Sequence, residues 1–527
     1  MRNRLQSSQS WIAVGAYSIL ALALIPLFGL YLAASAEPPL FASPPLDPVS
    51  VAWLLARTIA LALGVSVISL SLGTWLAWCD TSYDFRGRRT LEIISILPLA
   101  IPSYLLAGVI REVMAPRGLV GGLIGSESSF SGFGAALIVL SISCTPYVQL
   151  LVRATLTELP GHLDEAARLL GASPWRRFCS LVIPILRPAW AFSLVIVAFY
   201  TISDFGAVAV LDCEVLTWAL YQNRHTPRDV VTLGVVLMGV VIPTMIFIRW
   251  IQGQHRDAAS IGVARPKART LLSWPRQVGV YTSYALVVIP GLVIPVGAII
   301  GWVSGGLSSG MQWHGLADQI GHTLYYTFIG AVATLIAALF MAWFVTRGGT
   351  SRGWVEYAVY LTSGLPGILI AVGIFYVLIQ ARSVTSSGSD FMLWFEGIGG
   401  FLFLGYLMRF LSEGYAALKP GIVALDPRVE EAAKTLGASS FKRFWLIVVP
   451  QVRPSIVAAL ILLVVAIAKE LPITLLLTPL GEQTLAYRIF DAQQEGALPE
   501  SGVSALLLLV MVFAVQVAVQ RRRRDAH

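Results

Sequence analysis

Long apolar runs, separated by short polar and charged segments, dominate the chain. Twelve of these runs reach the length of about 20 residues that a helix needs to cross the hydrocarbon core of a bilayer. They lie near residues 11–32, 52–78, 91–113, 133–152, 189–208, 230–250, 279–302, 320–345, 355–379, 398–415, 455–474 and 502–519. Because backbone in lipid must satisfy its own hydrogen bonds, and because the runs lack the alternation of barrel strands, we expect an all-α polytopic membrane protein.

The first run and the prolines within later runs carry further expectations. The run 11–32 precedes a small-residue sequence that resembles a cleavage site, but it is longer than the apolar core of about 7–15 residues in a signal peptide. We expect it to be a retained first helix. Pro98, Pro102 and Pro366 fall inside apolar runs and should kink their helices.

One polar stretch within this apolar chain occurs twice. Residues 165–184 read EAARLLGASPWRRFCSLVIP, and residues 431–450 read EAAKTLGASSFKRFWLIVVP. Both copies share the Glu-Ala-Ala triplet and the spacing to a following Gly, Phe and Pro. A charged segment kept twice with the same internal spacing indicates a docking surface. The alternative is an amphipathic loop that lies on the lipid headgroups.

Other residues repeat at nearly the same offset, so the chain divides into two halves. The matched pairs are Thr58 with Thr323, Trp78 with Trp343, Pro102 with Pro366, and Asp204 with Glu470. We expect a first six-helix repeat over residues 1–253, a cytoplasmic linker over 254–277 and a second six-helix repeat over 278–527. An even number of spans in each half makes the two repeats parallel.

The repeated stretch predicts a helix, a turn at glycine and a second helix. In the second copy, Asp426 can cap a helix whose first residue is Pro427. Gly437 can end that helix, and Ser439 can cap the next one. The first copy has Gly171 at the position of Gly437.

This stretch resembles the EAA loop of the membrane subunits of binding-protein-dependent ABC importers. The resemblance implies the type I ABC importer permease fold, in which each loop fits a cleft on an ATP-binding subunit. The residues that it assigns to coupling are Glu165, Ala166, Ala167 and Gly171 in the first copy, and Glu431, Ala432, Ala433 and Gly437 in the second. Two loops on one chain imply two copies of the ATP-binding subunit, and the family also implies a periplasmic or extracellular substrate-binding protein.

The chain is therefore expected to be a transport subunit and not an enzyme, with no cofactor of its own. No G-x-x-x-x-G-K-[ST] sequence occurs in it, so the phosphate-binding loop of an ATPase must lie on another chain. A second resemblance concerns Ser203-Asp204-Phe205-Gly206 and Lys469-Glu470-Leu471-Pro472, which look like segments of fused ferric-iron permeases of the Fbp/Sfu type. Thiamine, phosphonate and polyamine permeases are close relatives and remain alternatives.

Composition and charge agree with a membrane location. Hydrophobic residues make up 56% of the chain, charged residues make up 13%, and the net charge is +8. Most Lys and Arg residues, including a group that extends from Arg409 to Arg453, fall in segments assigned to the cytoplasm, as the positive-inside rule requires. We therefore expect a multi-pass protein of the bacterial inner membrane with both termini in the cytoplasm, and no nucleic-acid partner.

Asp204 and Glu470 are the candidate substrate-pathway residues, because ionisable groups within a membrane are costly unless they face a cavity or a partner. Each lies 16 residues after a proline that opens a span. Hard Fe³⁺ favours oxygen ligands, so both carboxylates suit a transient site, with Tyr104 and Tyr200 as further candidates. The alternative is that both carboxylates are structural groups at helix ends. No metal-ligand spacing stands out, so a resident metal stays unassigned.

A secondary transporter of the major facilitator type is the alternative from another class. It also has six plus six spans and the same orientation. Residues 84–89, Asp-Phe-Arg-Gly-Arg-Arg, partly match the loop motif of that class. That class does not account for the repeated EAA loops.

Overall fold

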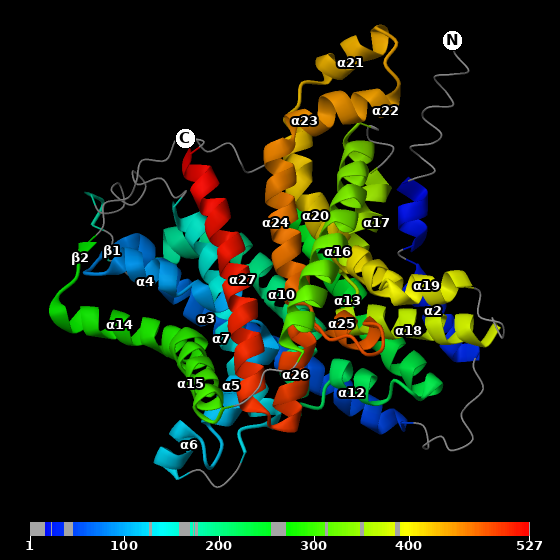
Figure 1. Cartoon of the computed structure of the whole chain (residues 1–527). Helices are drawn as coiled ribbons and strands as arrows, with labels where there is room; N and C mark the ends of the chain where they lie inside the picture. The colour runs from blue at the N-terminus through cyan, green and yellow to red at the C-terminus, as the bar shows by residue number, and fades with distance from the viewer. Residues whose placement is uncertain are drawn as a thin grey trace.

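The computed structural model describes residues 16–22, 24–35, 46–125, 129–157, 169–171, 173, 176, 178–254, 270–310, 315–347, 353–384 and 390–525, nearly all of them in helices (Figure 1). The helices of the first half are α2 (Ile25–Ser35), α3 (Pro48–Ser82), α4 (Arg88–Ile94), η1 (Leu97–Ala100), α5 (Ser103–Val113), α6 (Leu119–Ile124), α7 (Gly132–Thr157), η2 (Phe178–Val182), α10 (Ile183–Ser203), α11 (Gly206–Val210), α12 (Leu216–Gln222) and α13 (Pro227–Gln254).

The second half repeats this order. Its helices are α14 (Trp274–Val288), η3 (Ile289–Val293), α15 (Ile294–Ser308), α16 (Leu316–Thr346), α17 (Gly353–Ser363), α18 (Gly367–Val384), α19 (Asp390–Gly397), α20 (Gly400–Val423), α21 (Pro427–Thr435), α22 (Ser440–Arg443), η5 (Phe444–Val448), α23 (Val449–Gln451), α24 (Arg453–Ala468), α25 (Pro472–Leu477), α26 (Leu485–Glu495) and α27 (Leu498–Asp525). Two short strands, β1 (Tyr83–Asp84) and β2 (Thr270–Leu271), pair in parallel.

Seven helices among the described residues are long and apolar enough to cross a membrane, and the number rises to eleven when each of four bent helix pairs counts as one span. A shorter apolar stretch, Leu498–Ala514, lies in α27. The prediction of a helical, multi-pass protein is confirmed apart from the two-residue strands β1 and β2, whereas the count of twelve spans stays a prediction.

The predicted proline kinks are present as sharp breaks. The chain bends by 99° between the segment formed by α4 and η1 and the following helix α5, next to Pro98 and Pro102. The chain bends by 88° between α17 and α18, next to Pro366. Proline lacks the backbone N–H that would continue a helix, so the chain changes direction at these positions.

The first helices of the two halves are exchanged. Helix α2 packs against α18 of the second half as well as α13 of its own, and α14 and α15 contact α3 and α5 of the first half while α15 also packs against α27 of its own. A buried polar contact strengthens this exchange, because the hydroxyl of Tyr284 on α14 donates to Oδ1 of Asp80 on α3 at 2.5 Å. The hydrophobic core therefore joins the halves, with residues of α18, α26 and α27 included in the core cluster of the first half.

Candidate functional site

The second copy of the repeated stretch forms the helix, glycine turn and helix that the sequence predicts. The Asp426 carboxylate accepts a hydrogen bond from the backbone N–H of Arg428 at 3.0 Å and so caps α21. Gly437 follows with φ of +83°, in the left-handed region that favours glycine. The Ser439 hydroxyl then accepts from the N–H of Lys442 at 3.3 Å and caps α22.

This loop presents an exposed surface. Helices α21 and α22 project from one end of the molecule, opposite α12 and α26 (Figure 1). Glu431, Ala432 and Gly437 are exposed and Ala433 is half-buried. The loop also exposes large apolar side chains, with Leu436 88% and Phe441 73% accessible. Exposed apolar groups on a projecting polar segment mark an interaction surface.

The first copy shares the features that fall within the described residues. Gly171 has φ of +74°. The hydroxyl of Ser173 accepts from the N–H of Arg176 at 3.3 Å, as Ser439 does in the second copy. Leu170, the counterpart of Leu436, is 87% exposed. The remaining predicted coupling residues of this copy, Glu165, Ala166 and Ala167, lie outside the described residues.

Asp204 and Glu470 occupy equivalent helix breaks. Asp204 lies between α10 and α11, and its Oδ1 accepts from the N–H of Ala207 at 2.9 Å. Glu470 lies between α24 and α25, and its carboxylate accepts from the N–H groups of Ile473 and Thr474, each at 3.0 Å. Each carboxylate therefore caps the short helix that follows it and satisfies N–H groups that the break would leave unpaired.

The size of the neighbouring residue differs between these two carboxylates and offsets the difference in their length. In the first half, Ser103 donates its hydroxyl proton to Oδ2 of Asp204 at 2.5 Å. In the second half, the residue after the matched proline is Gly367, and a Cβ added there would lie 3.0 Å from Oε1 of Glu470. The longer carboxylate is therefore paired with the smaller neighbour.

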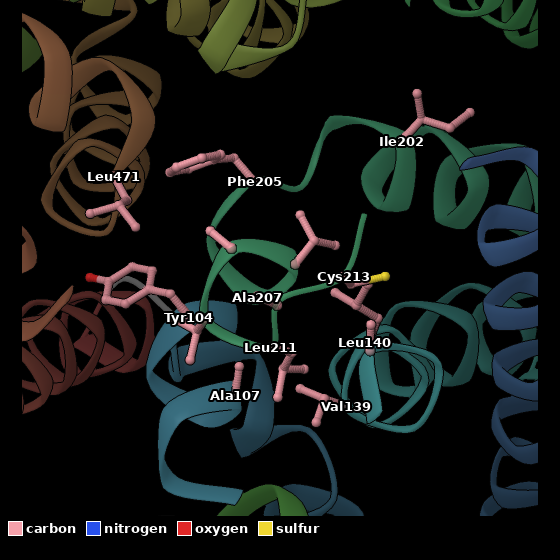
Figure 2. Packing of buried hydrophobic residues seen from close by; sticks show 14 of the residues in the cluster. Tyr104, Ala107, Val139, Leu140, Ile202, Phe205, Ala207, Leu211, Cys213 and Leu471 are labelled. Atoms are coloured by element: carbon pink, nitrogen blue, oxygen red, sulfur yellow. The ribbon is translucent and has the colours of Figure 1, made fainter. Parts of the chain in front are cut away.

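A cavity of about 730 Å³ lies where these breaks meet, lined by residues of both halves. All four predicted pathway residues, Asp204, Glu470, Tyr104 and Tyr200, line it. Figure 2 shows Tyr104 and Phe205 of the first half on the same side of the packing as Leu471 of the second. The structure thus brings the four candidates together, while their contact with a substrate stays a prediction.

Three charged residues on the cavity wall were not predicted. Arg409 and Glu413 come from the middle of α20, and Lys469 follows α24. Glu413 lies close enough to Arg409 and Lys469 to interact with both charges. The Lys469 ammonium also donates to the carbonyl of Leu99 at 3.1 Å, across the boundary between the halves. The sequence pattern groups Arg409 with the cytoplasmic basic residues, whereas it lies within a helix, on the cavity.

Two buried hydroxyls on the same wall have unused hydrogen-bonding capacity. Neither Tyr104 Oη nor Ser203 Oγ has a hydrogen-bond partner among the described residues. Buried polar groups are normally paired with protein or water. The cavity therefore offers hydroxyls, carboxylates and cations to whatever enters it. No group of three or more His, Cys, Asp or Glu side chains within the described ranges is placed to hold a metal ion.

Comparison with known families identifies the duplicated architecture. Residues 69–256 and residues 330–524 each match the family described as "Binding-protein-dependent transport system inner membrane component". The chain belongs to this family. Each matched region contains one copy of the repeated loop and one of the two carboxylate breaks, so the duplication inferred from the sequence is confirmed. The major facilitator alternative is excluded.

Several permeases named for ferric transport are similar in sequence to this one. It is 26% identical to an Fe(3+)-transport system permease protein, FbpB 2, of Haemophilus influenzae, over 88% of this chain and 90% of that protein. It is 23% identical to the ferric transport system permease protein FbpB of Actinobacillus pleuropneumoniae, over 88% of this chain and 70% of that protein. A probable sulfate transport system permease protein, cysT, of Anthoceros angustus is 29% identical over 38% of this chain and 69% of its own length.

The family assignment fixes the general role. The permease is a multi-pass inner-membrane component of a transport system, and it works with ATP-binding and substrate-binding partners. The match to the Haemophilus influenzae permease covers 88% of this chain and therefore includes residues of both repeats.

Proposed function

We propose that this permease forms the complete transmembrane pathway of an ABC importer for ferric iron. The observation that carries the proposal is one chain with two copies of a loop that share a glycine turn and a serine cap, together with a cavity lined by residues of both halves. Permeases of ferric transport systems match 88% of the chain, and this similarity supports ferric iron as the substrate. One permease would then assemble with two ATP-binding subunits.

In the proposed mechanism, the loops that contain Glu431 and Glu165 rest in clefts of the ATP-binding subunits in the cytoplasm, where both chain termini also lie. ATP binding closes the two subunits, and the loops follow them. The two halves then exchange inward access to the cavity for outward access. A substrate-binding protein outside the cell delivers the ion, and ATP hydrolysis resets the permease.

Asp204, Glu470, Tyr104 and Tyr200 supply oxygen atoms to the cavity and suit a hard cation in transit. Because both carboxylates also cap helices, an ion that bound them would compete with backbone N–H groups. Weak, transient binding suits a transport pathway, since a cargo that is held tightly is released slowly.

A second candidate cargo is an oxyanion such as sulfate. The guanidinium of Arg409 and the ammonium of Lys469 line the cavity, and such groups recognise oxyanions. The matches to permeases named for sulfate transport agree with this candidate, although they cover less than half of the chain.

Uptake measurements separate these cargoes. Cells that contain the complete system, with or without this permease, are given labelled ferric iron, sulfate or thiamine in separate assays. We expect the permease to increase iron uptake alone. A permease-dependent increase for sulfate or thiamine, without one for iron, contradicts the iron assignment and leaves the importer architecture intact.

A further inference from the structure

Glu430 is the buried residue of α21, whose other residues are exposed or, at Ala433, half-buried. It precedes the second Glu-Ala-Ala triplet, and its neighbours Val429 and Glu431 are exposed, whereas Glu430 is only 7% accessible. A carboxylate is rarely buried without a partner, because the charge would lose its hydration. The side chain must therefore face a specific contact in the body of the permease.

That contact is the end of α16. Oε1 of Glu430 accepts from Nε of Arg347 at 2.7 Å, and Oε2 accepts from the indole N–H of Trp343 at 3.3 Å. Arg347 also donates to the carbonyl of Leu425, just before α21, at 3.4 Å. Three hydrogen bonds thus tie both the start of the loop and its first helix to α16. We call Trp343, Arg347 and Glu430 the α16 clamp.

The α16 clamp connects the loop to the cavity through rigid elements. Helix α16 packs along α20 and α24. Helix α20 carries Arg409 and Glu413, and α24 leads directly to Lys469 and Glu470, all on the cavity wall. Displacement of α21 is therefore transmitted to helices that define the pathway. Chains of packed side chains and rigid helices carry energetic coupling between distant sites.

The first half has no arginine at the position that matches Arg347. At the offset that matches Trp78 with Trp343, the position of Arg347 is occupied by Ser82. Serine has no charge and a much shorter side chain, so it cannot form the same bond with a carboxylate on the first loop. An arginine equivalent to that of the α16 clamp is therefore missing from this position of the first half.

We propose that the α16 clamp is the joint that transmits motion of the second loop to the transmembrane helices, so that the second loop drives the pathway more strongly than the first. These are positioning residues, since they act through α16 and not on the cargo. The inference rests on the proposed coupling function of the loops.

The test uses the whole transporter in liposomes: permease, ATP-binding subunits and substrate-binding protein. ATP hydrolysis and cargo uptake are measured on the same sample, and their ratio is the readout. Glu430→Gln keeps an acceptor for the indole but removes the charge. We expect the uptake per ATP hydrolysed to fall about five-fold or more, which is the lower end of typical coupling effects, while the ATP-binding subunits still co-purify.

The matched control is the ion pair between Lys419 on α20 and Glu356 on α17, whose side chains are buried to a similar extent as that of Arg347. Glu356→Gln should leave the ratio unchanged. The charge-swapped variant Arg347→Glu/Glu430→Arg should recover much of the lost ratio. If Glu430→Gln fails to assemble, Arg347→Lys, which keeps the charge and loses the Nε donor, should give a smaller fall in the ratio.

An unchanged ratio in Glu430→Gln, or an equal fall in Glu356→Gln, overturns the inference, because a purely structural contact would give either result. Ser82 is the counterpart of Arg347 in the first half, so the variant Ser82→Ala tests whether the two loops differ in their effect on the pathway. If this variant lowers the ratio as much as Glu430→Gln does, the two loops act equally. If the unmodified permease binds no ATP-binding subunit, the proposed function fails instead.

Discussion

The hydroxyl of Thr58 accepts a hydrogen bond from the backbone N–H of Leu216 at 3.0 Å, which joins α3 to the start of α12. The second half repeats this bond, since the hydroxyl of Thr323 on α16 accepts from the N–H of Leu485 at 2.8 Å. Each threonine also donates to a carbonyl one turn earlier in its own helix. The sequence match between Thr58 and Thr323 therefore corresponds to the same hydrogen bond in both halves.

Thr58→Val should destabilise the permease, because it leaves the buried N–H of Leu216 without its acceptor. Such an unsatisfied group costs about 1–3 kcal/mol. Thr58→Ser keeps the acceptor and should cost less. The midpoint of thermal unfolding of the purified protein in detergent measures both effects, and Thr323→Val should lower it to a similar degree. Equal midpoints for Thr58→Val and the unmodified protein would refute the importance of this bond.

Asp204 has Ser103 as its neighbour, whereas the longer Glu470 has Gly367. This difference predicts that substitutions at Gly367 and Glu470 have non-additive effects on stability. Gly367→Ser brings a side chain against Glu470, and Glu470→Asp shortens the carboxylate that caps α25. Each change alone should lower stability, whereas the double variant recreates the arrangement of Ser103 with Asp204. We expect a favourable coupling free energy of about 0.5–3 kcal/mol, measured as a double-mutant cycle of unfolding midpoints. Additive losses would contradict the compensation.

How far the sequence predicts this structure depends on whether a feature is repeated. The capped second loop and the pairing of Asp204 with Glu470 follow from comparison of the two halves, and the proline breaks follow from the chemistry of proline. Helix caps and kinks are local effects, so the residues concerned carry the information themselves.

Arg409, Glu413 and Lys469 on the cavity wall are different, because the first half has no charged residue at the matching positions. The positions 266 residues before Arg409, Glu413 and Lys469 hold Ser143, Tyr147 and Ser203. Comparison of the repeats therefore gives no signal for them. The exchange of α2 and α14 between the halves is likewise a matter of long-range packing, which apolar runs of equal length do not specify.

Gly437→Ala should weaken the binding of the ATP-binding subunit. The position has φ of +83°, and a non-glycine residue in this conformation costs about 1–2 kcal/mol. There is open space for the added methyl group, so the effect comes from the backbone alone. Gly437→Asn should be milder, because asparagine tolerates left-handed backbone better. Co-purification of the two subunits, quantified against the permease, is the measurement.

Gly481→Ala is the matched control for this prediction. Gly481 has φ of +90°, is exposed and likewise has open space, but it lies in the segment between α25 and α26. The same backbone strain there should leave co-purification unchanged. If both variants lose the partner equally, general destabilisation explains the loss and the turn at Gly437 has no special part in docking.

Helix α2 lies close to the backbone of the second half at Gly29, where an added Cβ would lie 1.8 Å from the carbonyl oxygen of Gly373. No side-chain rotation relieves a clash with backbone, so Gly29→Ala should separate α2 from α18 and lower the yield of folded, monodisperse permease. Gly297→Ala, on a first helix of the second half with open space around it, should be tolerated. Size-exclusion profiles of both variants in detergent provide the comparison. A normal profile for Gly29→Ala would show that α2 can move away from α18 without loss of the fold, and the exchange of first helices would then contribute little to holding the two halves together.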